Sequence, residues 1–305
     1  MKRVLLLLSL LLLLTGCGGG SGQGDGLKLA CTTYPVYLLA RAVTQDVEGV
    51  EVSLVVNQQV SCLHDYALTV SDMKLLESAD AVAVNGAGLE DFLGDALEGK
   101  YVIDCDEGIP LLEGEAHHHG EEEPDEQGHH HEDADPHIWM NPDNYARMAR
   151  NLADALAGLD SDHALAYQAN GEAAARRLED FYQELRDSEA GRAVAGAEII
   201  TFHDGFAYFA DAFDLHIAAA IEEEEGAEAS ARDLKETIAI VESQGLSAVF
   251  TEVNGSDNAA SIICAECGIR HYPLSMVMSG DAGDDLSAYE AAIRGNIETI
   301  REAYQ

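Results

Sequence analysis

Short runs of β-branched and other apolar residues alternate with amphipathic stretches through the first third of the chain. The runs predict strands at 27–33, 50–56, 81–86 and 101–105, and helices at 34–44 and from about residue 69. Pro35 falls in the first turn of the earlier helix, and Thr69 with Asp72 forms a capping-box pattern at the start of the later one. This alternation is typical of βα units that build a mainly parallel sheet.

A second series of the same kind follows residue 190. Strands are expected at 197–202, 216–221, 247–253 and 269–275, with intervening helices, one of them capped by Ser230 and Asp233. Between the two series, residues 141–160 predict one helix and residues 161–190 a second of nearly thirty residues, which would span about 40 Å.

The predicted fold class is therefore α/β, with two lobes of parallel-sheet βα units joined by one long rigid helix. The expected boundaries are 27–159 for the N-terminal lobe, which includes a His- and acid-rich loop at 113–135, 160–190 for the linking helix, and 191–305 for the C-terminal lobe. No internal sequence repeat is visible beyond the shared βα pattern.

The N-terminus reads as an export signal, since two basic residues precede a leucine-rich run too short to span a membrane as a helix. Leu14-Thr15-Gly16-Cys17 resembles the lipobox of bacterial lipoproteins, which implies a signal peptide at 1–16 and a lipid on Cys17. Residues 17–26 are glycine-rich and predict a flexible tether. We expect an extracytoplasmic protein that is lipid-anchored to the bacterial cell membrane.

Acidic residues outnumber basic ones by 56 to 17, which disfavours nucleic acid and favours cations as partners.

Five cysteines remain besides Cys17, and an odd number in an exported protein leaves at least one free thiol. Cys264 and Cys267 form a CxxC pair within a helical pattern that has no second CxxC. Packing, or half of a disulfide, is favoured over a zinc or redox site.

Seven of the twelve histidines fall in residues 117–137. Three histidines outside the clusters at 117–119 and 129–131 follow predicted strands. His64 lies in the loop after one strand, His137 follows the loop after another, and His203 ends a third. In open α/β sheets, ligands bind beyond the carboxyl ends of strands, and three converging imidazoles would suit zinc. His163, His216 and His271 are interpreted as structural.

Around His64, His137 and His203, the sequence resembles the zinc- and manganese-specific solute-binding lipoproteins of bacterial ABC transporters. The resemblance rests on five segments in the family's order, which are distributed along the mature chain: 32–43, 63–93 (LHDYALT…), 135–142 (DPHIWMNP), 201–213 (TFHDGFAYFADAF) and 230–253. It implies a metal held between two lobes linked by a rigid helix, with His64, His137 and His203 as ligands. It also implies a monomeric receptor, with no enzymatic activity, that delivers Zn²⁺ to an ABC permease and its ATPase.

Zinc is favoured over manganese at the third ligand position. Manganese-binding members tend to carry glutamate where His203 stands, and imidazole suits zinc while carboxylate oxygen suits manganese. The fourth ligand stays open. Counting back from Tyr289 and Asn296 puts Ser287 where family members often have aspartate, so a neighbouring aspartate or a water could serve; the aspartates are Asp281, Asp284 and Asp285.

The run at 117–131 is too acidic and too poor in apolar residues to fold alone. Either it is a solvated loop with no role, or it collects zinc for the tighter site through its six histidines. These are His117, His118, His119, His129, His130 and His131. The second interpretation is favoured, and loops of this kind also occur in zinc members of the family.

Two other classes of function are weighed against a zinc receptor. A zinc hydrolase would need an open metal position and a general base, but no HExxH motif or comparable acid pair occurs. Asp65 and Asp204, which follow His64 and His203, fit supporting or surface positions better. A surface adhesin or zinc store would be favoured if no permease recognised the protein. A manganese receptor of the same family is the nearest alternative.

Overall fold

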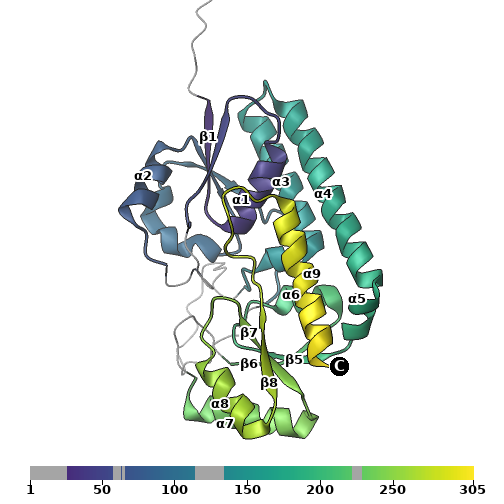
Figure 1. Cartoon of the computed structure of the whole chain (residues 1–305). Helices are drawn as coiled ribbons and strands as arrows, with labels where there is room; N and C mark the ends of the chain where they lie inside the picture. Colours follow the sequence, from purple (N-terminus) through teal and green to yellow (C-terminus); the bar gives the residue numbers. More distant parts are fainter. Residues whose placement is uncertain (1–25, 58–62, 64–65, 114–133, 222–228) are drawn as a thin grey trace, which may run out of the picture.

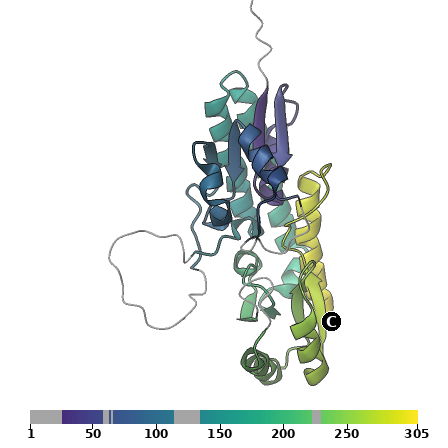
Figure 2. The same ribbon diagram turned by 90° about the vertical axis from the view of Figure 1, so that its left-hand side faces the viewer.

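The computed structural model describes residues 26–57, 63, 66–113, 134–221 and 229–305. It has two α/β lobes, one above the other in Figures 1 and 2, and long helices run along both. The predicted fold class is confirmed, because each lobe contains one four-stranded sheet whose pairings are all parallel.

The first lobe is built around a sheet of strand order β2-β1-β3-β4. Its strands are β1 (Leu27–Cys31), β2 (Val50–Leu54), β3 (Ala81–Val84) and β4 (Tyr101–Asp104). Its helices are α1 (Tyr34–Val43), α2 (Val70–Ser78), the 3-10 segments η1 (Leu89–Leu97) and η2 (Ile138–Met140), and α3 (Pro142–Leu159). The capping box of α2 is confirmed: the Thr69 hydroxyl accepts from the Asp72 amide at 3.3 Å, and the Asp72 carboxylate accepts from the Thr69 amide at 2.8 Å.

The second lobe repeats the same strand order, β6-β5-β7-β8. Its strands are β5 (Glu198–Thr201), β6 (His216–Ala220), β7 (Ala248–Glu252) and β8 (Arg270–Leu274). Its helices are α5 (Glu189–Val194), α6 (Ala207–Phe213), α7 (Ala231–Gln244), α8 (Asn258–Cys267) and α9 (Leu286–Ala303). In both sheets the connections reverse direction between the first and third strands of the lobe. Such a switch point is where open α/β sheets bind ligands.

Helix α4 (Ala164–Asp187) connects the two lobes. Near its start, the Asn170 side-chain amide donates to the Val43 carbonyl of the first lobe at 3.0 Å, and near its end the Tyr182 hydroxyl donates to the Ala212 carbonyl of the second lobe at 2.7 Å. Its 24 residues span about 36 Å. The helix is shorter than the sequence suggested, because the Ser188 side chain caps α5 and starts a new helix there.

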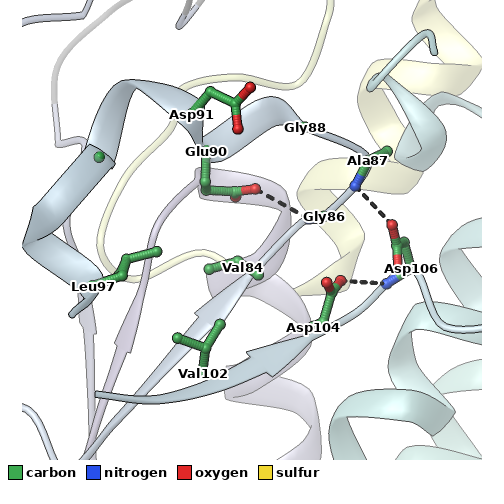
Figure 3. Close-up of a pocket in the computed structure, with 11 residues that line it drawn as sticks. Val84, Gly86, Ala87, Gly88, Glu90, Asp91, Leu97, Val102, Asp104 and Asp106 are labelled. Atoms are coloured by element: carbon green, nitrogen blue, oxygen red, sulfur yellow. Dashed lines mark hydrogen bonds between the residues drawn. The ribbon is translucent and has the colours of Figure 1, made fainter. Parts of the chain in front are cut away.

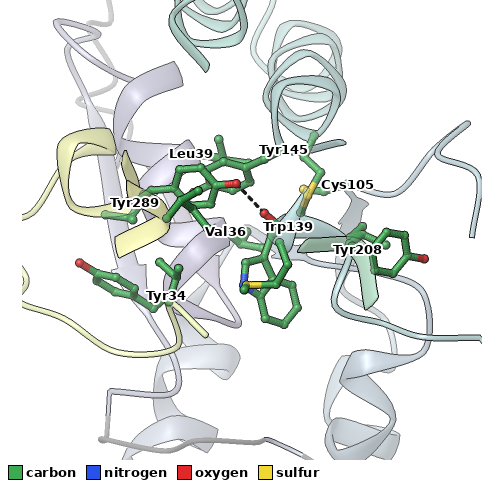
Figure 4. Packing of buried hydrophobic residues seen from close by; sticks show 14 of the residues in the cluster. Tyr34, Val36, Leu39, Cys105, Trp139, Tyr145, Tyr208 and Tyr289 are labelled. Atoms are coloured by element: carbon green, nitrogen blue, oxygen red, sulfur yellow. Dashed lines mark hydrogen bonds between the residues drawn. The ribbon is translucent and has the colours of Figure 1, made fainter. Parts of the chain in front are cut away.

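One apolar core runs through both lobes, which fixes them against each other. Figure 4 shows part of it around Trp139. The ring of Tyr145 stacks on that of Tyr289 from α9, with centroids 4.1 Å apart, and the Tyr289 hydroxyl donates to the Trp139 carbonyl at 2.8 Å. A smaller core lies between the second sheet and helices α7 and α8.

Candidate metal site

His137 and His203 come from different lobes and meet at the junction between them. His137 immediately precedes η2 and His203 follows β5 by two residues. Both side chains are buried, with 4% of each residue exposed. Their Nε2 atoms lie 3.2 Å apart, and their rings are perpendicular with centroids 5.0 Å apart. Two predicted ligands that are 66 positions apart in sequence are thus brought together.

The separation of the two nitrogens suits a shared metal ion. Two nitrogens bound to a tetrahedral zinc at 2.0–2.1 Å would lie about 3.3 Å apart. The 3.2 Å between the Nε2 atoms is close to this value. Little rearrangement of the two rings is therefore needed for both to bind one ion.

A carboxylate stands behind each imidazole. His137 Nδ1 lies 2.8 Å from Asp135 Oδ1, which also accepts from the His137 backbone amide, and His203 Nδ1 lies 3.5 Å from Glu252 Oε1. Because a carboxylate accepts hydrogen bonds, it favours the tautomer with its proton on Nδ1. Each Nε2 then presents a lone pair to the same point, which is the arrangement that a metal-binding histidine requires.

Asp135 and Glu252 were not singled out by the sequence analysis. Both are buried, with 4% and 8% exposed. Glu252 is the last residue of β7, the strand beside β5. Its position at the switch point of the second sheet could have indicated a role near the ligand. Asp135 precedes His137 by two residues in the DPHIW segment and had no signal beyond that proximity.

We expect Asp135→Asn to weaken zinc binding about tenfold, since loss of a carboxylate behind a ligating histidine typically costs 10- to 100-fold. Asparagine still offers an oxygen to His137 but removes the charge that supports the ligand. Asp160→Asn is the matched control, because Asp160 makes the same contact with His163 Nδ1, at 2.7 Å, in the turn between α3 and α4. Competition with a zinc-chelating dye measures both. Equal affinity in the two variants would contradict a role for Asp135.

The third predicted ligand, His64, lies outside the described residues. Its neighbour Leu63 is described and fully buried in the shared core. Within the described residues, no three His, Cys, Asp or Glu side chains are grouped so that they could hold a metal ion. The pair of His137 and His203 is therefore the part of the predicted site that the structure brings together.

The three aspartates proposed for the fourth position lie in the loop before α9. Asp284 accepts from the Tyr34 hydroxyl at 2.5 Å and from the Asp281 amide at 2.7 Å. Asp285 caps α9 by accepting from the Ser287 amide at 2.7 Å, and Asp281 is exposed. Asp284 thus links this loop to α1 of the first lobe, and Asp285 caps α9.

The six histidines of the run and the expected lipidation site Cys17 lie outside the described residues. Of the other cysteines, Cys62 also lies outside them, while Cys31, Cys105, Cys264 and Cys267 are free thiols. Cys264 and Cys267 are residues of α8 and pack against the smaller core, in agreement with the packing interpretation. Burial raises the pKa of both thiols.

A cavity of about 410 Å³ opens elsewhere, at the carboxyl ends of β3 and β4 (Figure 3). Among the described residues, no histidine lines it; it is bordered by Val84, Leu97, Val102 and acidic residues that include Glu90. The Glu90 carboxylate accepts from the Thr32 hydroxyl at 2.6 Å and from the amides of Asn85 and Gly86 at 2.7 and 3.1 Å. Glu90 therefore ties the ends of β1 and β3 together at the switch point of the first sheet.

Burial raises the pKa of Glu90 from 4.5 to about 7, against the lowering effect of its three donors. The folded state therefore binds this proton more tightly than the unfolded state. The resulting contribution to stability is complete below about pH 4.5, and it is lost as the pH rises to about 7.

We expect Glu90→Gln to remove this dependence. Relative to the variant, the wild-type protein should lose about 3 kcal/mol of unfolding free energy between pH 4.5 and pH 7.5. Urea unfolding at both pH values tests this, with Glu77→Gln, at an exposed position on α2, as the control. Parallel pH profiles for the wild-type protein and Glu90→Gln would contradict the assignment.

The model of the ZnuA family, the periplasmic component A of zinc-uptake complexes, matches residues 29–303. The chain belongs to the ZnuA family. This agrees with the family resemblance of its motifs, and it makes the protein a metal-binding receptor of an ABC uptake system rather than a member of an enzyme family.

Relatives within this family differ in the metal that their names state. The chain is 25% identical to the high-affinity zinc uptake protein ZnuA of Bacillus subtilis, over 92% of this chain and 88% of that protein. It is 23% identical to the manganese-binding lipoprotein MntA of Halalkalibacterium halodurans, over 68% and 65% of the two chains. The zinc-binding protein AdcA of Streptococcus pyogenes is 25% identical over 90% of this chain, which spans 55% of the length of AdcA.

Solved structures share the fold of the ZnuA family. A crystal structure of ZnuA superimposes with a TM-score of 0.75 and 28% identity, over 92% of this chain and all of the other. Among the described residues, no helix is both long enough and apolar enough to cross a membrane.

Proposed function

We propose that the protein is an extracytoplasmic receptor that binds one Zn²⁺ tightly between its lobes and delivers it to an ABC permease. The observation that carries the proposal is the pair of buried imidazoles, His137 and His203, whose Nε2 atoms lie 3.2 Å apart across the lobe junction. His64 completes the set of three nitrogen ligands. In the sequence His64 follows β2, and the sheet of β2 also includes β4, the strand that precedes His137 in the chain.

The metal is proposed to be zinc because the donor set is rich in nitrogen. Imidazole ligands in a four-coordinate site suit zinc, whereas manganese favours carboxylate, carbonyl and water oxygens in six-coordinate sites. The carboxylates of Asp135 and Glu252 face the Nδ1 side of the rings, where they support ligands and do not replace them. We propose water as the fourth ligand, since Asp284 is hydrogen-bonded to Tyr34 of the first lobe and Asp285 caps α9.

The remaining proposals concern how the receptor is held and supplied. A lipid on Cys17 would anchor a monomer to the membrane through the tether at 17–26, beside the permease and its ATPase. The run at 117–131 would collect zinc through its six histidines and its carboxylates, and raise the local concentration near the tighter site. The lobes, 27–159 and 191–305, would be joined by the helical segment 160–190.

Mass spectrometry of the purified protein tests the choice of metal most simply. The protein is equilibrated with manganese in large excess over zinc, because sites with nitrogen and oxygen ligands generally bind zinc more tightly than manganese. We then expect one retained zinc ion per chain. Retained manganese would favour the manganese receptor, the nearest alternative. Zinc uptake by cells that lack the protein separates a receptor from an adhesin or a zinc store, since only loss of a receptor should lower the rate at which zinc enters the cell.

A further inference from the structure

The loop after β8 contains three consecutive buried residues, Met276, Val277 and Met278, each with 3–6% of its surface exposed. Val277 has φ of +59°, in the left-handed region that β-branched residues rarely adopt. Such a conformation costs about 1–3 kcal/mol and persists only where surrounding contacts enforce it. The conformation of this short segment is therefore imposed by its neighbours.

Two hydrogen bonds hold the segment in place. The indole Nε1 of Trp139 donates to the Met276 carbonyl at 2.8 Å, and the Val277 amide donates to the Ser275 hydroxyl at 3.1 Å. Trp139 follows His137 by two residues, and the two rings lie 5.2 Å apart. The backbone of Met276 in the second lobe is thus tied to the segment that carries His137 in the first lobe.

The side chain of Met276 ends beside both histidines. A Cβ atom built on Gly205 would lie 2.3 Å from Met276 Cε, 2.6 Å from His203 Cδ2 and 3.1 Å from His137 Cδ2. The methyl group and the two ring carbons therefore pack together in the space that a side chain at residue 205 would need, and glycine at this position permits their close approach. Because Cδ2 is bonded to Nε2, the methyl lies near the metal-binding edge of both rings.

We propose that Met276 is a specificity-determining residue that closes one side of the metal's coordination sphere with an apolar group. This inference rests on the proposed zinc site. A methyl group offers no lone pair and leaves no room for water on its side, so it disfavours ions that need six ligands. Zinc with four ligands tolerates this closure, whereas Mn²⁺ loses water that it requires.

Substitution of Met276 should shift the ratio of zinc to manganese affinity. We expect Met276→Ala to raise manganese binding relative to zinc about tenfold, because water can enter the space that the methyl vacates. Met276→Gln has a similar length, so it preserves packing, and its amide oxygen is a hard ligand that should shift the ratio in the same direction. Met276→Leu retains an apolar group and should keep the wild-type ratio.

Met278→Ala is the matched control, since Met278 lies two residues away in the same buried segment. Affinities for zinc and manganese are measured by competition with a fluorescent chelator, and thermal melting confirms that each variant is folded. If the wild-type protein binds zinc tightly but the ratio of zinc to manganese affinity is unchanged in both Met276→Ala and Met276→Gln, the role of Met276 is refuted while the proposed function stands. An equal shift in Met278→Ala would also refute that role. Absence of tight zinc binding in the wild-type protein would refute the proposed function itself.

Discussion

Alanine at either His137 or His203 should weaken zinc binding by about 100-fold or more, because each replacement removes one of three imidazole ligands from a four-coordinate site. The Nε2 atoms of the two rings lie 3.2 Å apart, so both can bind the same ion. The remaining histidine would then hold the ion with one partner fewer and with water in the vacated position. Titration calorimetry, with a competing chelator for the wild-type protein, measures the loss.

His216→Ala is the control for this pair, since His216 is exposed at the start of β6. It should leave zinc affinity unchanged. Near-wild-type affinity in both His137→Ala and His203→Ala would mean that the tight site lies elsewhere in the chain.

Replacing residues 115–133 by two glycines should remove the additional weak zinc ions and keep the single tight one, since none of the three proposed ligands lies in this segment. The cut suits the fold, because Glu113 and Ala134 form an antiparallel bridge and the Asp135 amide donates to the Leu112 carbonyl at 3.0 Å. With Gly114, the two glycines give a three-residue connection, a common length between antiparallel segments. The unfolding temperature should change little, because the segment contributes almost no apolar residues.

A second variant, with serine at all six histidines of the run, separates the effect of imidazole from that of charge. It should also lose weak zinc binding, but it keeps the carboxylates that attract cations over a Debye length of about 10 Å at 0.1 M salt. The salt dependence of zinc uptake should therefore diminish in the deletion and persist in the serine variant. Loss of the tight phase in either variant would show that the run itself is the binding site.

The secondary structure was largely predictable from local pattern. The eight strands of the described part of the chain fall within the expected segments, and the capping boxes of α2 and α7 form as Thr69-Asp72 and Ser230-Asp233. These features depend on residues a few positions apart, whose chemistry is visible in sequence. The helical pattern of the sequence continues to residue 190, but α4 ends at Asp187 because Ser188 caps the separate helix α5.

The surroundings of the site were less predictable, because they depend on contacts between distant segments. Glu252 stands behind His203 only once β5 and β7 pair, and Met276 reaches the histidines only because Trp139 and the left-handed Val277 direct it there. Neither contact leaves a periodic signal in the sequence. The need for glycine at position 205 is also visible only in three dimensions, because a side chain there would collide with Met276, His203 and His137.

Anomalous X-ray diffraction from crystals grown with one equivalent of zinc tests the central claim most directly. The proposed site predicts a single strong zinc peak between His137 Nε2 and His203 Nε2, at about 2.0–2.1 Å from each, with His64 as the third protein ligand. A peak on the residues of the 117–131 run, or one coordinated mainly by carboxylates away from His137 and His203, would contradict it.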